Sequence, residues 1–175
     1  MQPGVILYQS KYGATKKYAT WLQQKLGYDC FETKKVTIQQ IMPYRTILLG
    51  GGIYASHIAG LSFLKKNIHV LQDKIVAIFC VGASPYDEST FQEVRKLNLK
   101  KNLKNLPCFY CRGAWDEKKM TVTDKLLCRM MQKMMARKDP ATFEPWETAL
   151  MSAVGRACDW TDPKNLDPIL KYLKG

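Results

Sequence analysis

The residues best suited to chemistry stand where the first apolar segment of the chain ends. Residues 5–9 are mostly apolar, and Ser10, Gly13 and Thr15 follow them just before a helix-forming segment. Two hydroxyl groups, a glycine that allows close backbone approach and the N–H groups at a helix start together favour an anion. The sequence therefore predicts a phosphate-binding turn between a strand and a helix.

This turn matches neither of two common nucleotide-binding motifs. The P-loop requires Gly-Lys-Ser/Thr at the helix start, and the dinucleotide fingerprint requires three spaced glycines. Residues 10–15 contain one glycine and neither pattern. Both nucleotide-binding classes are therefore disfavoured.

Two further glycine-bearing loops follow other apolar segments. Residues 50–56 and residues 81–87 each combine glycine with a tyrosine, Tyr54 in the first and Tyr86 in the second. Glycine allows a ligand to approach the backbone, and a tyrosine ring offers a flat apolar face. Two such loops around a planar ring, with the first turn holding its phosphate, describe a site for flavin mononucleotide (FMN).

A repeated strand-then-helix pattern would position these loops. Apolar segments predict five strands, at residues 5–9, 29–34, 46–49, 74–81 and 106–111. Helical patterns occupy residues 14–26, 59–70, 89–99 and 165–173. Such alternation predicts a doubly wound parallel sheet, in which ligands bind beyond the carboxyl ends of the strands. The three loops are expected at that edge.

Length and cysteine usage indicate the class of protein. A chain of 175 residues is expected to form one domain over residues 1–175. Its six cysteines lie among apolar neighbours, which favours buried thiols in a reducing cytoplasm over a disulfide scaffold. The longest apolar runs are well short of the roughly 20 residues that span a membrane. We therefore expect a cytoplasmic protein.

Cys108 and Cys111 have the spacing of a redox dithiol or of half a zinc site. They fall on a predicted strand, however, where residues three apart point to opposite faces, and no second Cys or His pair completes four ligands. We interpret both as structural and expect no metal site.

Residues 115–162 form a helical insertion before the closing helix, much longer than an ordinary connection. Within it, an apolar stripe consists of Leu126, Leu127, Met130, Met131, Met134 and Met135. A basic row beside it consists of Lys125, Arg129, Lys133 and Arg137. Like charges four residues apart oppose a helix by roughly 0.2–0.5 kcal/mol per pair. Either the stripe packs on the domain, or the helix contacts an anionic membrane surface or an acidic partner.

The net charge of +12 is informative about partners. It favours encounters with acidic proteins and anionic lipids. The charge is accompanied by no helix-turn-helix, zinc-finger or RNA-binding pattern, so we expect no nucleic-acid binding.

The phosphate turn, the Gly-Gly-Ile-Tyr-Ala-Ser loop at residues 51–56 and Asp159-Trp160 before the last helix resemble the flavodoxin family. The resemblance is nearest to the branch that includes menaquinone-dependent protoporphyrinogen oxidase. It implies an α/β flavodoxin-like three-layer sandwich with parallel strand order 2-1-3-4-5 and a helical insertion after strand five. It also implies FMN as the cofactor and electron transfer as the activity.

The resemblance assigns cofactor contacts residue by residue. In the first loop the contacts are Ser10, Lys11, Tyr12, Gly13, Ala14 and Thr15; in the second, Gly52, Ile53, Tyr54 and Ala55; in the third, Val81, Gly82, Ala83, Ser84, Pro85 and Tyr86. Tyr12 stands where the family has threonine, and Lys16 and Lys17 add positive charge beside it.

These features predict an FMN-binding protein that transfers electrons to a redox partner protein or a quinone. No catalytic residue is singled out. One alternative is an enzyme like the quinone-dependent protoporphyrinogen oxidases, held at the membrane surface. Another is a flavodoxin-fold binding module without a cofactor.

Overall fold

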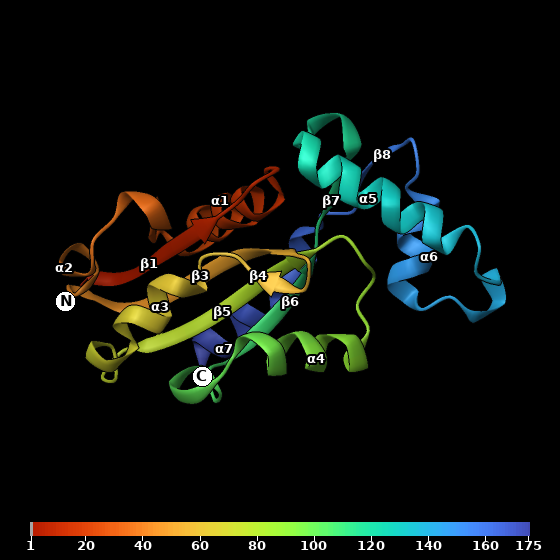
Figure 1. Cartoon of the computed structure of the whole chain (residues 1–175). Helices are drawn as coiled ribbons and strands as arrows, with labels where there is room; N and C mark the ends of the chain where they lie inside the picture. Colours follow the sequence, from red (N-terminus) through yellow and green to blue (C-terminus); the bar gives the residue numbers. More distant parts are fainter. Residues whose placement is uncertain (1) are drawn as a thin grey trace.

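The computed structural model describes residues 2–175 and has a parallel sheet with helices on both faces (Figure 1). Its parallel strands are β1 (Gln2–Gln9), β2 (Asp29–Glu32), β3 (Tyr44–Tyr54), β5 (Ile75–Gly82) and β6 (Cys108–Arg112). They are ordered β2-β1-β3-β5-β6, and the short strand β4 (His57–Ile58) pairs antiparallel with β3. This is the predicted order 2-1-3-4-5, and the flavodoxin-like fold class is confirmed.

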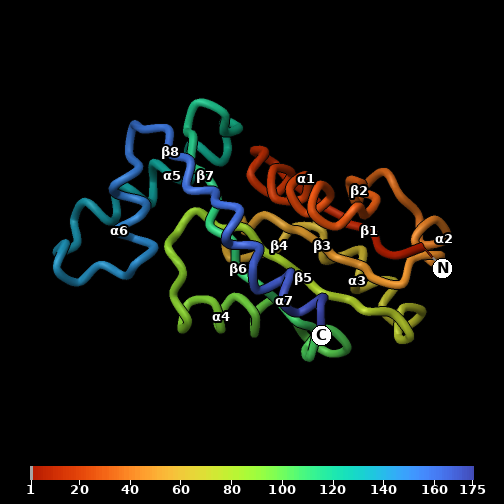
Figure 2. The backbone as a smooth tube through the Cα atoms, turned by 180° about the vertical axis from the view of Figure 1, so that it is seen from behind, coloured from red at the N-terminus to blue at the C-terminus, as the bar shows by residue number. Residues whose placement is uncertain are grey.

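Two helical layers enclose the sheet because successive strand residues face opposite sides. In β1, Ile6 packs with α1 (Ala14–Leu26) and α7 (Asp167–Lys174), which lie across the face seen in Figure 2. Its neighbour Leu7 belongs to the opposite core, which includes residues of α2 (Ile38–Ile41), α3 (Leu61–Asn67) and α4 (Glu88–Asn98). Each fully buried aliphatic side chain of these cores contributes about 1.5–3 kcal/mol.

Tyr18 joins one helical layer to the carboxyl edge of the sheet. Its side chain is fully buried, and its hydroxyl donates to the carbonyl of Arg112 at 2.6 Å. The same oxygen accepts from the Asp162 N–H at 3.1 Å and from Asn165 Nδ2 at 2.7 Å. One phenol thereby fixes α1, the end of β6 and the start of the last helical segment.

The largest boundary difference lies after the third strand, which extends to Tyr54. Gly52 pairs with Val81 of β5, so Gly52, Ile53 and Tyr54 lie in a strand and only Ala55 lies in a turn. The Ala55-Ser56 turn, with φ of 46° and 63°, joins β3 to β4, and α3 therefore begins only at Leu61. Two-residue hairpin turns with positive φ usually contain glycine or asparagine, and this turn contains neither.

The remaining differences are short. The second strand ends at Glu32, two residues before its predicted end. Single 3-10 turns lie at Thr33–Lys35, Ile68–Val70, Lys101–Leu103, Glu117–Lys119, Pro140–Thr142 and Pro163–Leu166.

The insertion forms a lobe beyond the carboxyl edge of the sheet (Figure 1). It contains β7 (Ala114–Asp116), α5 (Val122–Met135), α6 (Pro145–Ser152) and β8 (Ala157–Asp159). The strands β7 and β8 pair antiparallel, so the lobe begins and ends at the same place. Inside it, Lys138 Nζ lies 2.7 Å from Oε2 of the buried Glu147, which joins the segment after α5 to α6.

Cys108 and Cys111 belong to the two opposite cores, as the strand spacing predicts. Burial raises the pKa of the Cys111 thiol to about 12, so this cysteine stays protonated. All six cysteines are free. Among residues 2–175 there is no cluster of His, Cys, Asp or Glu suited to a metal ion. Within the same range, every helix is too short or too polar to cross a membrane.

The crowded backbone around the end of β3 makes a stability prediction. A Cβ added at Gly51 would lie 2.1 Å from the carbonyl oxygen of Ala59, which is backbone and cannot rotate away. We expect Gly51→Ala to lower the free energy of unfolding by about 1–3 kcal/mol. Ser56→Gly removes the strain of a left-handed φ but also gives the unfolded chain more conformational freedom. Because these two effects oppose each other, the free energy of unfolding should change by less than about 1 kcal/mol. Urea unfolding measures both, and equal losses in the two variants would contradict this assignment of strain.

Candidate functional site

The first predicted loop connects β1 to α1. Gly13 adopts a left-handed φ of 100°, and its N–H donates to Ser10 Oγ at 3.0 Å. As the residue before α1 it offers no side-chain cap, and the first turn of this helix carries no acidic residue. The first N–H groups of a helix have no partner within the helix. The start of α1 is therefore open to an anion.

Thr15 lies in that first turn and carries the most informative atom of the loop. The residue is 1% exposed, and its Oγ1 has no hydrogen-bond partner among the described residues. A buried polar group left unpaired costs about 1–3 kcal/mol. A phosphate oxygen at the helix start would accept a hydrogen bond from this hydroxyl. The residues present therefore fit the phosphate end of FMN.

Tyr54 joins the first loop to the end of β3. Its hydroxyl accepts the Lys11 N–H at 2.9 Å, and its ring meets that of Tyr12 edge-on with 6.0 Å between centroids. A Cβ on residue 52 would lie 2.5 Å from the Tyr54 hydroxyl, so the Tyr54 side chain can lie against this backbone only because residue 52 is glycine. Burial raises the pKa of Tyr54, which keeps the phenol protonated. The structure thus brings these two predicted regions together.

At the third loop, Val81 and Gly82 are the last residues of β5, and residues 83–86 lead to α4. Gly113, just after β6, donates its N–H to the carbonyl of Gly82 at 2.6 Å. A Cβ on Gly113 would lie 2.9 Å from Val81 Cγ1 and 3.6 Å from Ala14 Cβ. The ends of β5 and β6 and the start of α1 therefore converge on Gly113. Gly113 was not predicted from the sequence, although a glycine two residues after a predicted strand was a usable signal.

Tyr86 does not pair with Tyr54 in this structure. It is 56% exposed, and its ring lies beside Phe91 and Tyr110, with centroids 5.7 and 5.9 Å away. Its hydroxyl forms a hydrogen bond with Glu88. Tyr86 therefore packs against α4 and β6, and its stacking on a flavin ring stays a prediction.

The insertion contacts the first loop through Asp124 at the start of α5. The Lys11 ammonium and the Tyr12 hydroxyl both form hydrogen bonds to Asp124 Oδ2. These two donors, with Lys11 the stronger, hold the pKa of Asp124 below its usual range. Thr121 caps α5 by accepting the Asp124 N–H, and its own N–H donates to the Tyr12 hydroxyl at 3.3 Å. Asp124 was not predicted from the sequence, since no local pattern links it to Lys11 and Tyr12, more than a hundred residues away.

A second attachment holds the base of the lobe. Lys17 Nζ lies 2.8 Å from both Asp159 Oδ2 and Thr161 Oγ1, and this contact lowers the pKa of Asp159 to about 2. The backbone N–H of Trp160 donates to the Gly113 carbonyl at 3.0 Å, and the Arg112 guanidinium lies 4.5 Å from the centre of the Trp160 ring. Lys17 and Lys11 are therefore both paired with carboxylates of the lobe, and of the lysines near the phosphate turn Lys16 takes part in no ion pair among the described residues.

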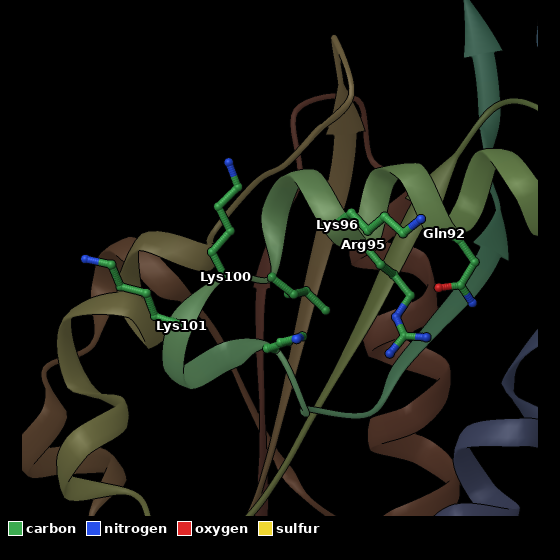
Figure 3. Close-up of a pocket in the computed structure, with 7 residues that line it drawn as sticks. Gln92, Arg95, Lys96, Lys100 and Lys101 are labelled. Carbon is green, nitrogen blue, oxygen red and sulfur yellow. The ribbon is translucent and has the colours of Figure 1, made fainter.

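A separate basic hollow lies at the end of α4 (Figure 3). Its volume is about 480 Å³, and its lining consists of Gln92, Arg95, Lys96, Leu99, Lys100, Lys101 and Lys104. None of the predicted cofactor contacts lines it. Cations near the carboxyl end of a helix are stabilised by its dipole. This effect applies to Arg95 and Lys96 in the last turn of α4, whereas the other three lysines lie beyond the helix end.

Comparison with solved structures finds similar chains of low sequence identity. A WrbA-like flavodoxin from Agrobacterium tumefaciens is 16% identical, with 87% of this chain and 92% of that chain covered and a TM-score of 0.48. A putative flavoprotein from Bacteroides eggerthii DSM 20697 is 15% identical, with 78% and 99% covered and a TM-score of 0.48. A flavoprotein in complex with FMN from Lactobacillus acidophilus NCFM is 15% identical, with 64% and 93% covered and a TM-score of 0.41.

Comparison with curated proteins finds no match. The branch that includes protoporphyrinogen oxidase is not supported by any of these findings. The family model described as a flavodoxin domain matches residues 5–142, which is most of the chain. The chain therefore belongs to the flavodoxin domain family.

Proposed function

We propose that this protein is an FMN-binding redox protein that holds the FMN phosphate in the turn between β1 and α1. The observation that carries the proposal is the buried Thr15 hydroxyl, which has no acceptor although it lies at the start of a helix. The open first turn of α1 offers N–H donors to the same anion. Membership of the flavodoxin domain family supports the identity of the ligand.

Bound FMN supplies one- and two-electron transfer chemistry. The chain itself binds and orients the group. Gly13 lets the backbone close around the phosphate, because its left-handed φ is strained for other residues. Tyr54, kept neutral by burial, offers a hydroxyl donor and an aromatic face beside the turn. On the lobe side, the Tyr12 hydroxyl contacts Asp124 and the N–H of Thr121.

We also propose that α5 docks on an anionic membrane surface, where the protein would meet a quinone as its redox partner. Part of the apolar stripe does not pack on the domain: Leu126, Met130 and Met134 are 69%, 53% and 58% exposed. Met131 and Met135 are half-buried. Exposed apolar side chains beside a one-signed basic row are typical of helices that lie in a lipid interface.

The charges of α5 favour lipid over a second copy of the chain. Lys125, Arg129, Lys133 and Arg137 take part in no ion pair among the described residues. A two-fold contact between two α5 helices would bring these rows together, because such an interface uses the same patch on both subunits. Like charges across an interface oppose association. An anionic surface instead complements the row.

The phosphate assignment predicts opposite effects of one substitution on stability and on binding. Thr15→Val removes an unpaired buried hydroxyl at nearly constant shape, so the ligand-free protein should be as stable as wild type or more stable. FMN affinity should fall about tenfold, the loss of one hydrogen bond to a charged group, while riboflavin affinity stays the same. Thermal unfolding and fluorescence titrations measure the two effects.

Thr20→Val is the matched control, because Thr20 is exposed on the same helix and its hydroxyl donates to the carbonyl of Lys16. It should leave FMN affinity unchanged. Equal FMN affinity in Thr15→Val and wild type would show that the phosphate lies elsewhere. A wild-type protein that binds neither flavin would instead be the binding module without a cofactor.

The docking surface predicts a loss of vesicle binding when its charges are reversed. Replacement of Lys125, Arg129, Lys133 and Arg137 by Glu should weaken binding to phosphatidylglycerol vesicles more than about tenfold, since each basic residue near an anionic membrane contributes about 1 kcal/mol. FMN binding should persist. The control replaces four exposed lysines elsewhere, Lys100, Lys104, Lys171 and Lys174, by Glu.

A second variant, with Leu126, Met130 and Met134 replaced by Ser, keeps the charge and removes the apolar contact. It should also weaken vesicle binding in co-sedimentation, because interfacial helices need both contributions. Equal losses in the charge-reversed and control proteins would show general attraction by net charge. Unchanged binding in both α5 variants would exclude this helix as the membrane contact.

A further inference from the structure

We infer that Asp124 competes with the phosphate of a bound flavin for Lys11 and Tyr12, so that the lobe itself limits the affinity of the site for FMN. This inference rests on the proposed function and names the residue of the chain that regulates the same site. It makes Asp124 an internal anion, supplied from α5, that is displaced from the turn when phosphate binds.

The contacts on Asp124 are those expected of a bound anion. A single carboxylate oxygen, Oδ2, accepts hydrogen bonds from both Lys11 Nζ and the Tyr12 hydroxyl. Both donors belong to the turn that carries the unpaired Thr15 hydroxyl. The Lys11 ammonium also lies 5.5 and 5.9 Å from the ring centroids of Tyr12 and Tyr54, which hold it over the turn. The two side-chain donors of the turn, Lys11 and Tyr12, therefore both bind the carboxylate of Asp124 in the lobe.

Charge balance makes the two anions rivals. Asp124 neutralises the charge of Lys11, and Asp159 neutralises that of Lys17. A phosphate at the start of α1 would attract Lys11 more strongly than a single carboxylate does, because it carries more charge and more acceptor oxygens. The same phosphate would repel the carboxylate nearby. The phosphate and the Asp124 carboxylate therefore cannot both bind the Lys11 ammonium without a cost in free energy.

Displacement of Asp124 would weaken the attachment of α5 to the phosphate turn. Asp124 lies in the first turn of this helix, and the capping residue Thr121 also contacts Tyr12. Loss of these contacts leaves the lobe attached mainly at its base, through Lys17, Arg112 and Trp160. Phosphate binding should therefore loosen the first turn of α5 while the base stays fixed.

The test compares Asp124→Asn with wild type in the full chain. Asparagine keeps the shape and one acceptor oxygen but removes the charge. We expect Asp124→Asn to bind FMN at least about tenfold more tightly than wild type, with riboflavin affinity changed by less than about twofold. Asp73→Asn is the control, because it removes the same charge at the opposite edge of the sheet, before β5.

Two measurements need no flavin chemistry. Isothermal titration with inorganic phosphate should show tighter binding by Asp124→Asn than by wild type and Asp73→Asn. Amide hydrogen exchange should show faster exchange in the first turn of α5 when FMN or phosphate is added to wild type, while β7 and β8 stay unchanged.

The outcomes separate this inference from the proposed function. If wild type prefers FMN to riboflavin and Asp124→Asn has the same FMN affinity, the inference fails and the site stands. A weaker affinity of Asp124→Asn for FMN also overturns it, since Asp124 would then orient Lys11 for the phosphate. If neither protein binds flavin, the proposed function fails, and the phosphate titration alone decides whether Asp124 competes with an anion.

Discussion

Parallel pairing of β1, β3, β5 and β6 is the constraint on which the rest of the structure depends. The register sets Gln9 beside Gly51, Gly52 beside Val81, and Gly82 beside Arg112. Because all four strands run the same way, their carboxyl ends lie on one edge, and the chain leaves that edge through four neighbouring connections. The three predicted cofactor loops lie at these strand ends.

That edge is closed by contacts from the lobe as much as by the loops. Lys17, Arg112 and Gly113 each contact residues 159–161, and Tyr12 contacts Asp124 and Thr121. The contact between Lys11, in the turn before α1, and Asp124 of α5 joins segments more than a hundred residues apart in the sequence. The phosphate turn is consequently shaped by two separate parts of the chain, a helix dipole from α1 and a carboxylate from α5.

The fold could be predicted from the sequence because its signals are local. The apolar strands and Gly27, with its left-handed φ of 66° after α1, follow from residue type and spacing alone. The hairpin at Ala55-Ser56 could not, since its positive φ angles are imposed by pairing of β3 with β4. Asp124 and the orientation of Tyr86 could not either, because each depends on partners brought near only by the tertiary fold.

The antiparallel pair of β7 and β8 has a consequence for how such a domain changes over evolution. Asp116 pairs directly with Ala157, so the forty residues between them leave and return at one point. A loop whose ends are already held together can lengthen at small entropic cost, since each doubling of its length adds only about 0.6 kcal/mol. The sheet can therefore keep its architecture while descendants acquire, trade or lose whole lobes at this junction. Selection can then alter what contacts the phosphate turn without touching the strands that build it.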